Sequence, residues 1–262
     1  MLRKAKRMVE SVASRLGYTI IPNWRLEHYD QERYLAKLFQ LLEIDCVLDV
    51  GANRGQYRDF LRDYVGYSGT IVSFEPIPAL VEELRARAST DPAWIIEGCA
   101  LGSERKTAPF NVMSSSVFSS FLSPDHSKVS RFDRLNTVRE QIVVDAFTLD
   151  ERMACLSGRL GPRRTYLKLD TQGSDLDVAK GAAKTLKQVL ALQTEVSFKP
   201  IYAGMPDFVA AIRSFEALGF EVSGLFKLTD VTFPELIELD CHMISTEHVG
   251  GQGRGRPTAP AE

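Results

Sequence analysis

The stretch from Cys46 to Tyr57 constrains the fold more than any other part of the sequence. Its apolar run is broken by Asp49 and ends in Gly51 and Gly55, and an amphipathic pattern follows at once. This succession is typical of a strand, a tight turn and a helix. Glycine at the turn tolerates backbone conformations that a Cβ forbids, and we expect free amides at the helix start to hold a polar ligand.

Glu75 ends the next apolar run, at residues 70–74. In a nucleotide-binding βαβ unit, an acid about 20 residues after the glycine turn binds ribose hydroxyls. A dinucleotide fingerprint, GxGxxG, has a second glycine where this chain has Asn53, between Gly51 and Gly55. The spacing favours a nucleoside cofactor without a diphosphate, of which S-adenosylmethionine (SAM) is the common one. An ordinary strand-to-helix turn is the alternative.

The remaining elements alternate between the two types. Apolar runs predict strands, and helical spacing predicts helices, at the following residues: strands at 94–96, 165–169 and 189–196, and helices at 31–42, 78–88, 175–186 and 206–218. Alternation of this kind predicts a mostly parallel sheet with helices on both faces. Residues 220–226 and 235–245 read as a closing antiparallel hairpin.

The segment at residues 113–139 interrupts this alternation. It lies between apparent extra strands at 107–112 and 141–144 and is rich in serine and arginine. Loops of this length in a compact domain are usually functional or disordered. We expect a substrate-facing lid, with solvated disorder as the alternative.

Length, composition and net charge limit the fold classes and partners that the chain can have. With 262 residues, 44% hydrophobic and 25% charged, the chain suits one large soluble α/β domain with additions. We therefore divide it into an N-terminal helical extension at 1–44, a domain at 45–248 and a disordered tail at 249–262. The net charge of -2 gives no global attraction to nucleic acid, so we expect no nucleic-acid partner.

Residues 1–17 form a basic amphipathic pattern. This helix would lie on an anionic membrane surface or pack its apolar stripe on the domain. The segment lacks the uninterrupted apolar run of a signal peptide or a transmembrane helix. The four cysteines show no CxxC spacing, which favours a reducing compartment, either the open cytoplasm or the inner face of the membrane. The four histidines form no close pair, so no preformed metal site is visible.

Taken together in their order and spacing, several short motifs resemble those of FkbM-type SAM-dependent methyltransferases, over roughly residues 45–245. The motifs are Leu48-Asp49-Val50-Gly51-Ala52-Asn53-Arg54-Gly55-Gln56-Tyr57, Phe74-Glu75-Pro76, Ala100-Leu101-Gly102, Thr148-Leu149-Asp150, Leu167-Lys168-Leu169-Asp170-Thr171-Gln172-Gly173 and Lys180-Gly181-Ala182. The resemblance implies a Rossmann-like, seven-stranded, mostly parallel sheet with a reversed last strand, the class I methyltransferase fold.

The resemblance also implies a cofactor site for SAM. Asp49 and Gly51 would line its methionine end, Glu75 would bind the ribose hydroxyls, and Cys99 and Ala100 would lie beside the adenine. Three more residues of the first motif complete the predicted site: Asn53, Gly55 and Tyr57. Family members chiefly methylate hydroxyls, often on sugars of glycolipids, surface polysaccharides or secondary metabolites.

Candidates for the general base come from the strand ends, because ligands of open α/β sheets bind beyond the carboxyl ends of the strands. Asp170 is the first candidate for a base or a substrate-hydroxyl acceptor, with capping of the next turn as its alternative role. Glu195 is the second candidate, and its alternative role is that of a salt-bridged residue at the end of a strand. His126, in the segment at 113–139, is the third candidate, and its alternative is a solvated side chain without a catalytic role. A general base of this kind typically raises the reaction rate by about 10²- to 10⁴-fold.

These features predict a SAM-dependent O-methyltransferase that acts on a hydroxyl of a sugar, in a glycolipid, surface polysaccharide or related glycoconjugate. The expected partner is a saccharide or another hydroxyl-bearing small molecule. Two alternatives stay open at this point. The chain could methylate a small-molecule natural product, or it could be a non-catalytic nucleotide-binding module.

Overall fold

The computed structural model describes residues 12–13, 15–161, 163–228 and 232–249. Most of the basic segment at 1–17 and almost all of the tail at 249–262 lie outside these residues. The expectations of a membrane-surface helix and of a disordered tail therefore fall largely on residues that the structure does not describe. No helix within the described ranges is long and apolar enough to cross a membrane.

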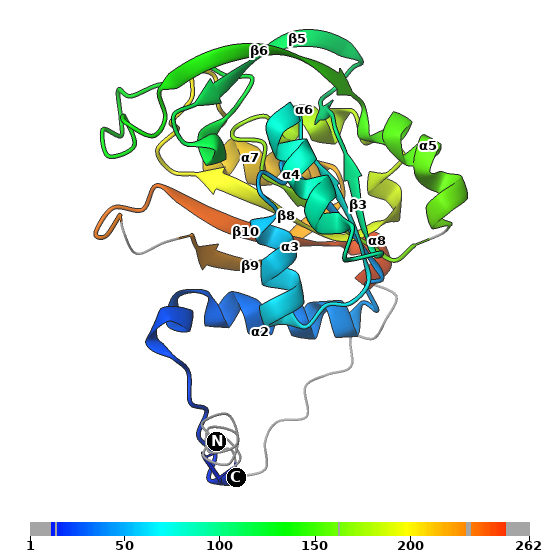
Figure 1. The fold of residues 1–262 in the computed structure, drawn as a ribbon. Helices are drawn as coiled ribbons and strands as arrows, with labels where there is room; N and C mark the ends of the chain where they lie inside the picture. The colour runs from blue at the N-terminus through cyan, green and yellow to red at the C-terminus, as the bar shows by residue number, and fades with distance from the viewer. Residues whose placement is uncertain (1–11, 14, 162, 229–231, 250–262) are drawn as a thin grey trace.

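A seven-stranded sheet forms the centre of the molecule, in the order β3-β2-β1-β7-β8-β10-β9 (Figure 1). Its strands are β1 (Cys46–Val50), β2 (Thr70–Phe74), β3 (Trp94–Glu97), β7 (Thr165–Leu169), β8 (Val189–Ser197), β9 (Phe220–Lys227) and β10 (Glu238–Ser245). All neighbours pair in parallel except β10, which runs antiparallel to both β8 and β9. The expected Rossmann-like sheet with a reversed last strand is confirmed.

Helices cover both faces of this sheet. One face carries α2 (Leu26–Leu41), α3 (Gln56–Phe60), which continues as a π-helical turn (Leu61–Val65), and α4 (Pro78–Ala88); the other carries α5 (Leu149–Leu160), α6 (Asp175–Lys180) and α7 (Phe208–Ala217). Side-chain alternation along β1 explains the two layers. Val47 packs in the cluster that includes Leu35 of α2, whereas Leu48 packs in the cluster that includes Phe215 of α7. β1 is therefore buried from both sides.

A smaller three-stranded sheet adds to the main one, in the order β4-β6-β5. It contains β4 (Ala100–Leu101), β5 (Lys106–Met113) and β6 (Val138–Phe147), and Figure 1 shows β5 and β6 as a long ribbon at the top of the molecule. The chain between β5 and β6 includes a 3-10 turn (Ser116–Phe118) and packs Phe118 and Val129 against Ile201 and Tyr202. This segment is therefore anchored on the domain.

Some element bounds differ from those expected. α2 begins at Leu26, ahead of the expected start at residue 31. The helix expected at 175–186 ends at Lys180. The next residue, Gly181, packs so closely on Gly102 that a Cβ would lie 2.1 Å from the Gly102 carbonyl oxygen. Asp150 then accepts hydrogen bonds from the amides of residues 184 and 185, which fixes a turn in place of another helical turn.

Candidate functional site

Two adjoining cavities lie at the carboxyl ends of the central strands. The larger, which we call the cofactor cavity, has a volume of about 530 Å³ and is lined from β1, β2, β7 and β8 and the turns that follow them. The smaller, which we call the second cavity, has a volume of about 350 Å³. Asp170, Gln172 and Glu195 line both, so these side chains lie where the two cavities meet.

The glycine turn after β1 forms one wall of the cofactor cavity. Gly51 has a φ of 83°, and a Cβ there would lie 1.9 Å from the carbonyl oxygen of Asp170. Only glycine fits this close approach between the β1 and β7 turns. Gly55 also has a φ of 83°, but it packs on Trp94 and does not line either cavity.

The amides of the turn itself have partners within the protein. The amides of Gly51 and Ala52 both donate to the Phe74 carbonyl, and that of Asn53 donates to Oε2 of Glu75. The amide of Arg54 donates to the side chain of Gln56, and α3, only five residues long, begins immediately afterwards. The turn therefore serves a ligand through its shape, because its amide donors are used within the protein.

Glu75 presents a carboxylate to the cofactor cavity while the backbone holds it. Its Oε1 accepts the amide of Ile77 at 2.8 Å, and its Oε2 accepts the amide of Asn53 at 2.8 Å. Burial raises the pKa of Glu75 to about 7, although these two hydrogen bonds lower it. Each oxygen keeps a further lone pair, so the carboxylate can still accept two ligand hydroxyls.

The wall next to Glu75 is apolar. Cys99 and Ala100 line the cavity, as do Ile77 and the edge-to-face pair Phe110 and Phe121, whose ring centroids are 5.0 Å apart. Burial raises the pKa of the Cys99 thiol to about 12, so this cysteine is a neutral wall residue. A flat, mostly apolar ring such as adenine suits this surface.

Asp49 and Tyr57, both predicted to bind the cofactor, differ in whether they line the cofactor cavity. The side chain of Asp49 is completely buried beneath the cavity, where its Oδ2 accepts the Ser73 hydroxyl at 2.9 Å and its Oδ1 lies 3.4 Å from Nζ of Lys168. Asp49 does not line either cavity. Tyr57 does line the cofactor cavity, and its hydroxyl donates to Oε1 of Gln193 at 2.9 Å.

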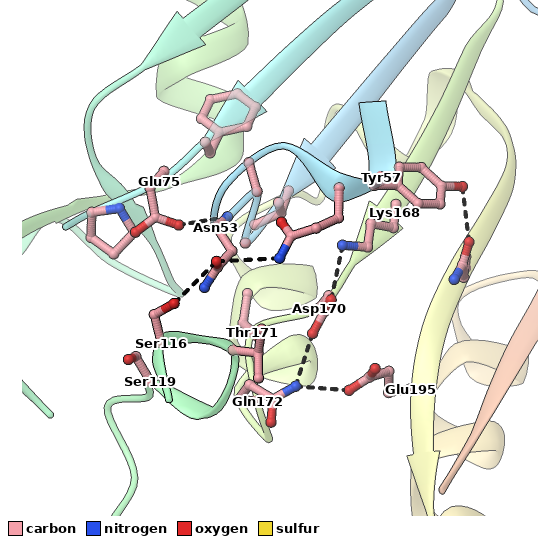
Figure 2. Close-up of a pocket in the computed structure, with 18 of the residues that line it drawn as sticks. Asn53, Tyr57, Glu75, Ser116, Ser119, Lys168, Asp170, Thr171, Gln172 and Glu195 are labelled. Carbon is pink, nitrogen blue, oxygen red and sulfur yellow. Dashed lines mark hydrogen bonds and ion pairs between the residues drawn. The ribbon is translucent and has the colours of Figure 1, made fainter. Parts of the chain in front are cut away.

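The first two candidate bases, Asp170 and Glu195, are brought together at the junction of the cavities (Figure 2). Nε2 of Gln172 lies 2.9 Å from Oδ1 of Asp170 and 3.0 Å from Oε2 of Glu195. Nζ of Lys168 lies 2.9 Å from the other Asp170 oxygen, Oδ2. Burial alone would lower the pKa of Lys168, but the charges of Asp170 and Asp49 outweigh burial and raise it, so Lys168 stays cationic.

The third candidate, His126, is not part of this arrangement. Its Nε2 lies 2.7 Å from the carbonyl oxygen of Asn136, its Nδ1 lies 3.9 Å from Oδ1 of Asp133, and it lines neither cavity. His242, which the sequence places inside an apolar strand, is buried with Nδ1 2.8 Å from the Tyr166 hydroxyl. Burial lowers the pKa of His242 to about 3, so it is neutral.

Acidic side chains outnumber basic ones around the junction. Burial, together with nearby carboxylates that include Asp170, raises the pKa of Glu195 well above its ordinary range and that of Glu238 to about 8. Burial also raises the pKa of Asp240 to about 6. Among the described residues, no group of three or more histidine, cysteine or acidic side chains is arranged to hold a metal ion.

Sequence reasoning missed several residues of the site. Lys168 and Gln172 lie within a recognised motif, and a charged residue inside a strand that is buried along its whole length is a signal that could have identified Lys168. His28 and Gln31 of α2 also line the cofactor cavity, and Nε2 of Gln31 donates to Oδ2 of Asp240 at 2.7 Å. That contact joins positions 209 residues apart and has no local signature.

The sheet order with its single reversed strand, the glycine turn after β1 and the acid after β2 are features of the class I methyltransferase fold. The sequence model of the Methyltransferase FkbM domain matches residues 49–222, about two thirds of the chain. The chain therefore belongs to the FkbM methyltransferase family, and its cofactor is SAM. The residues around Glu75 fit that cofactor, because they offer hydroxyl acceptors beside an apolar wall.

Solved structures of methyltransferases resemble the chain at low sequence identity. The methyltransferase FkbM from Methylobacillus flagellatus KT matches with a TM-score of 0.45 and 15% identity, over 76% of this chain and 43% of that chain. This chain thus spans less than half the length of that protein. Fibrillarin from Aeropyrum pernix, solved with natively bound SAM, matches with a TM-score of 0.41 and 11% identity, over 81% of this chain and 74% of that chain. No curated protein matches the sequence significantly.

Proposed function

We propose that this chain is an O-methyltransferase that transfers the methyl group of SAM to a hydroxyl of a saccharide, in a glycolipid, surface polysaccharide or related glycoconjugate. One observation carries the proposal. The cavity that contains Glu75 and the second cavity meet at Asp170, Gln172 and Glu195. A hydroxyl bound in the second cavity would have a proton acceptor beside it at the boundary with the cofactor.

The cofactor side follows from the residues present. SAM, when bound, supplies a methyl group that is already activated by a sulfonium. Glu75 would accept hydrogen bonds from the ribose hydroxyls, and the wall at Cys99 and Ala100 would exclude water from the adenine. Tyr57, fixed by Gln193, would close the cavity next to Lys168. The work left to the protein is to orient the acceptor and to take its proton.

The second cavity supports a saccharide as the acceptor. Three aromatic rings, Phe118, Phe132 and Phe233, line it together with the carboxyl groups of Glu195 and Glu238. Carboxylates accept hydrogen bonds from hydroxyls, and aromatic rings pack on the apolar C–H surface of a sugar ring. Phe118 and Phe132 belong to the segment at 113–139, which is the basis for proposing that this segment covers the substrate.

An acceptor screen with radiolabelled SAM tests the function. The full-length chain would be offered simple glycosides, lipid-linked saccharides, small phenols and small amines, and the new methyl group would be located in the product by NMR. We expect a methyl ether on a glycoside or a lipid-linked saccharide. Methylation of phenols alone would favour the natural-product alternative, and methylation of amines alone would refute O-methylation.

Calorimetry separates the enzyme from a non-catalytic nucleotide-binding module of another kind. We expect the chain to bind SAM and not to bind NAD, because the turn between Gly51 and Gly55 has Asn53 where a dinucleotide site has glycine. Tight binding of NAD without binding of SAM would contradict the proposed function at its first step.

We also propose that residues 1–17 contact an anionic membrane surface. The described residues at the end of this segment and just after it support this, since the large hydrophobic side chains of Leu16, Tyr18 and Ile20 are all at least half exposed. Sedimentation with anionic vesicles at low salt is the test, and removal of residues 1–17 should abolish it while SAM affinity is unchanged. If the full-length chain does not sediment with such vesicles, this proposal is wrong.

A further inference from the structure

Gln172 connects the two carboxyl groups at the junction of the cavities. Its Nε2 lies 2.9 Å from Oδ1 of Asp170 and 3.0 Å from Oε2 of Glu195. A side-chain amide nitrogen has two hydrogens, so each carboxyl group receives one of them. Figure 2 shows Gln172 between the two carboxyl groups. At the other end of the amide, the Tyr202 hydroxyl lies 2.9 Å from Oε1 of Gln172 and 2.7 Å from the Phe118 carbonyl oxygen.

The two carboxyl groups are otherwise unlike. Asp170 has a permanent cationic partner, because Nζ of Lys168 lies 2.9 Å from its Oδ2 and the Lys168 side chain is only 8% exposed. A proton on Asp170 would forfeit this ion pair and leave Lys168 with Asp49 alone. Within the described part of the chain, no basic side chain forms an ion pair with Glu195. Glu195 lines both cavities, and the Gln172 amide is bound to its Oε2, which leaves the other oxygen, Oε1, for an acceptor.

Most of the charged side chains around Glu195 are acidic. It lies directly opposite Asp240 in the antiparallel β8–β10 ladder. The charged groups that act on it from β7 and its following turn, α6 and β10 are Lys168, Asp170, Asp175, Glu238 and Asp240. Lys227 of β9 also lines the second cavity. Burial, followed by the charges of these acids, raises the pKa of Glu195, whereas Lys168 is already paired with Asp170 and Asp49. A proton on Glu195 would thus relieve repulsion, and no ion pair would be lost.

We propose that Glu195, and not Asp170, takes the proton of the acceptor hydroxyl, and that Gln172 is the positioning residue that keeps Glu195 turned toward the junction. This assignment rests on the function proposed above and deepens it. With SAM bound, the acceptor oxygen would form a bond to the methyl group, and the electron pair of the broken carbon–sulfur bond would stay with the cofactor. The hydroxyl proton passes to Oε1 of Glu195 and then to solvent. Asp170 keeps its charge throughout as the partner of Lys168.

The first test needs no acceptor. Glutamate labelled with ¹³C at the side-chain carboxyl would be placed in the full-length chain and titrated by NMR from about pH 5 to about pH 9. The Glu195 signal is identified by its loss in Glu195→Gln. We expect this signal to titrate well above the ordinary glutamate value near 4.3, because burial and the neighbouring acids raise the pKa of Glu195. A Glu195 that titrates at the ordinary value would overturn the assignment.

Gln172→Met tests the positioning role. Methionine has nearly the length of glutamine and donates no hydrogen bond, so the charged form of Glu195 loses a donor and its titration should move to higher pH. Tyr202→Phe is the matched control, because it removes one hydroxyl from the other end of the same amide. We expect it to move the titration less than Gln172→Met does. An unmoved Glu195 titration in Gln172→Met would refute the positioning role.

The second test uses any acceptor found in the screen. Glu195→Gln should lower kcat by about 10²- to 10⁴-fold, the usual loss for a general base, and should abolish a rise of kcat with pH. Asp170→Asn should lower kcat by about tenfold or less, since the orientation of Lys168 changes but the base is intact. If Asp170→Asn loses as much activity as Glu195→Gln, or more, the assignment is wrong.

The two sets of results separate this inference from the proposed function. Calorimetry with SAM shows that each variant is folded, since affinity should stay within a few-fold of the parent chain. Should the screen find only nitrogen acceptors, O-methylation fails while the Glu195 titration stands. Should a hydroxyl be methylated while Glu195 titrates normally, the function stands and the base is another residue.

Discussion

Two carboxyl groups face the site from strands that β1 and β7 separate: Glu75 follows β2, and Glu195 lies in β8. They are held in opposite ways. Glu75 accepts hydrogen bonds from two backbone amides, those of Asn53 and Ile77. Glu195 accepts from a single side-chain amide, that of Gln172, and Asp170 beside it is held by side chains alone. We call the surroundings of Glu75 the cofactor side, and the group of Lys168, Asp170, Gln172 and Glu195 the chemical side. Backbone amides hold the carboxyl group of the cofactor side, whereas side chains hold those of the chemical side. Substitutions should damage the two sides in different ways.

Lys168→Met should have the largest effect, because it acts on the side that is built from side chains. It would leave Asp49, which is completely buried, and Asp170 without their cation. Breaking a buried ion pair from one side typically costs about 3–5 kcal/mol, so we expect a loss of that order in the free energy of unfolding. Urea unfolding measures it.

Lys180→Met is the matched control for that experiment. Lys180 also has an acidic partner, Asp177, at 3.8 Å, but its side chain is 71% exposed. Exposed pairs contribute about 0–1 kcal/mol, so this variant should be almost as stable as the parent chain. Equal losses in the two lysine variants would show that the Lys168 cluster does not hold the chemical side together.

Glu75→Ala should weaken SAM binding by roughly one to two orders of magnitude, since charge-assisted hydrogen bonds are worth about 1.5–3 kcal/mol. Calorimetry measures this, with Glu83→Ala as the control because Glu83 forms a surface ion pair with Arg54 outside the cavity. Glu195→Gln should stay within a few-fold of the parent affinity. If Glu195→Gln weakens SAM binding more than Glu75→Ala does, the division into two sides is wrong.

The pH dependence of stability tests the buried acids of both sides. Burial raises the pKa of Glu75 to about 7 and that of Glu238 to about 8, so the folded chain binds more protons than the unfolded chain at neutral pH. Stability should therefore fall as the pH rises through this range, by about 1–3 kcal/mol. Neutral His242, whose pKa is lowered to about 3, works in the opposite direction below about pH 6.5.

Urea unfolding between about pH 6.5 and about pH 8 isolates the acids from His242. Glu238→Gln should flatten the slope over this range, because one of the carboxyl groups with a raised pKa no longer titrates. An unfolding free energy that increases with pH across the range would contradict the raised pKa values of Glu75 and Glu238.

The sequence predicted best what the main chain determines. Alternating elements gave the sheet and its reversed strand, and the acid at the end of β2 lies beside the glycine turn because neighbouring parallel strands end together. Side-chain partners were not predictable in this way. The bridge of Gln172 to Glu195 and the contact of Gln31 with Asp240 depend on how separate elements pack. Nor could spacing show that His126 lies away from the cavities.

The sequence pattern also does not predict whether a given side chain of the motif points into the cavity or into the protein. Asp49 stands in the same motif as Gly51, yet it is buried against Ser73 and Lys168 while Gly51 borders the cofactor cavity. The turn amides likewise look free in the sequence, and the structure uses them for Phe74 and Glu75. Each of these depends on a neighbouring strand, which a local pattern does not contain.

Ser116→Ala should have the smallest effect and locates the boundary between the two sides. The Ser116 hydroxyl lies 3.2 Å from Oδ1 of Asn53, so the segment between β5 and β6 contacts the cofactor turn. Losing one neutral hydrogen bond costs about 0.5–1.5 kcal/mol, and we expect SAM affinity to fall by about two- to tenfold. Ser114→Ala is the control, because its hydroxyl contacts the Thr137 carbonyl and Ser114 lines neither cavity. The Glu195 titration should not move in either variant. If Ser116→Ala shifts that titration while SAM affinity is unchanged, the segment belongs to the chemical side.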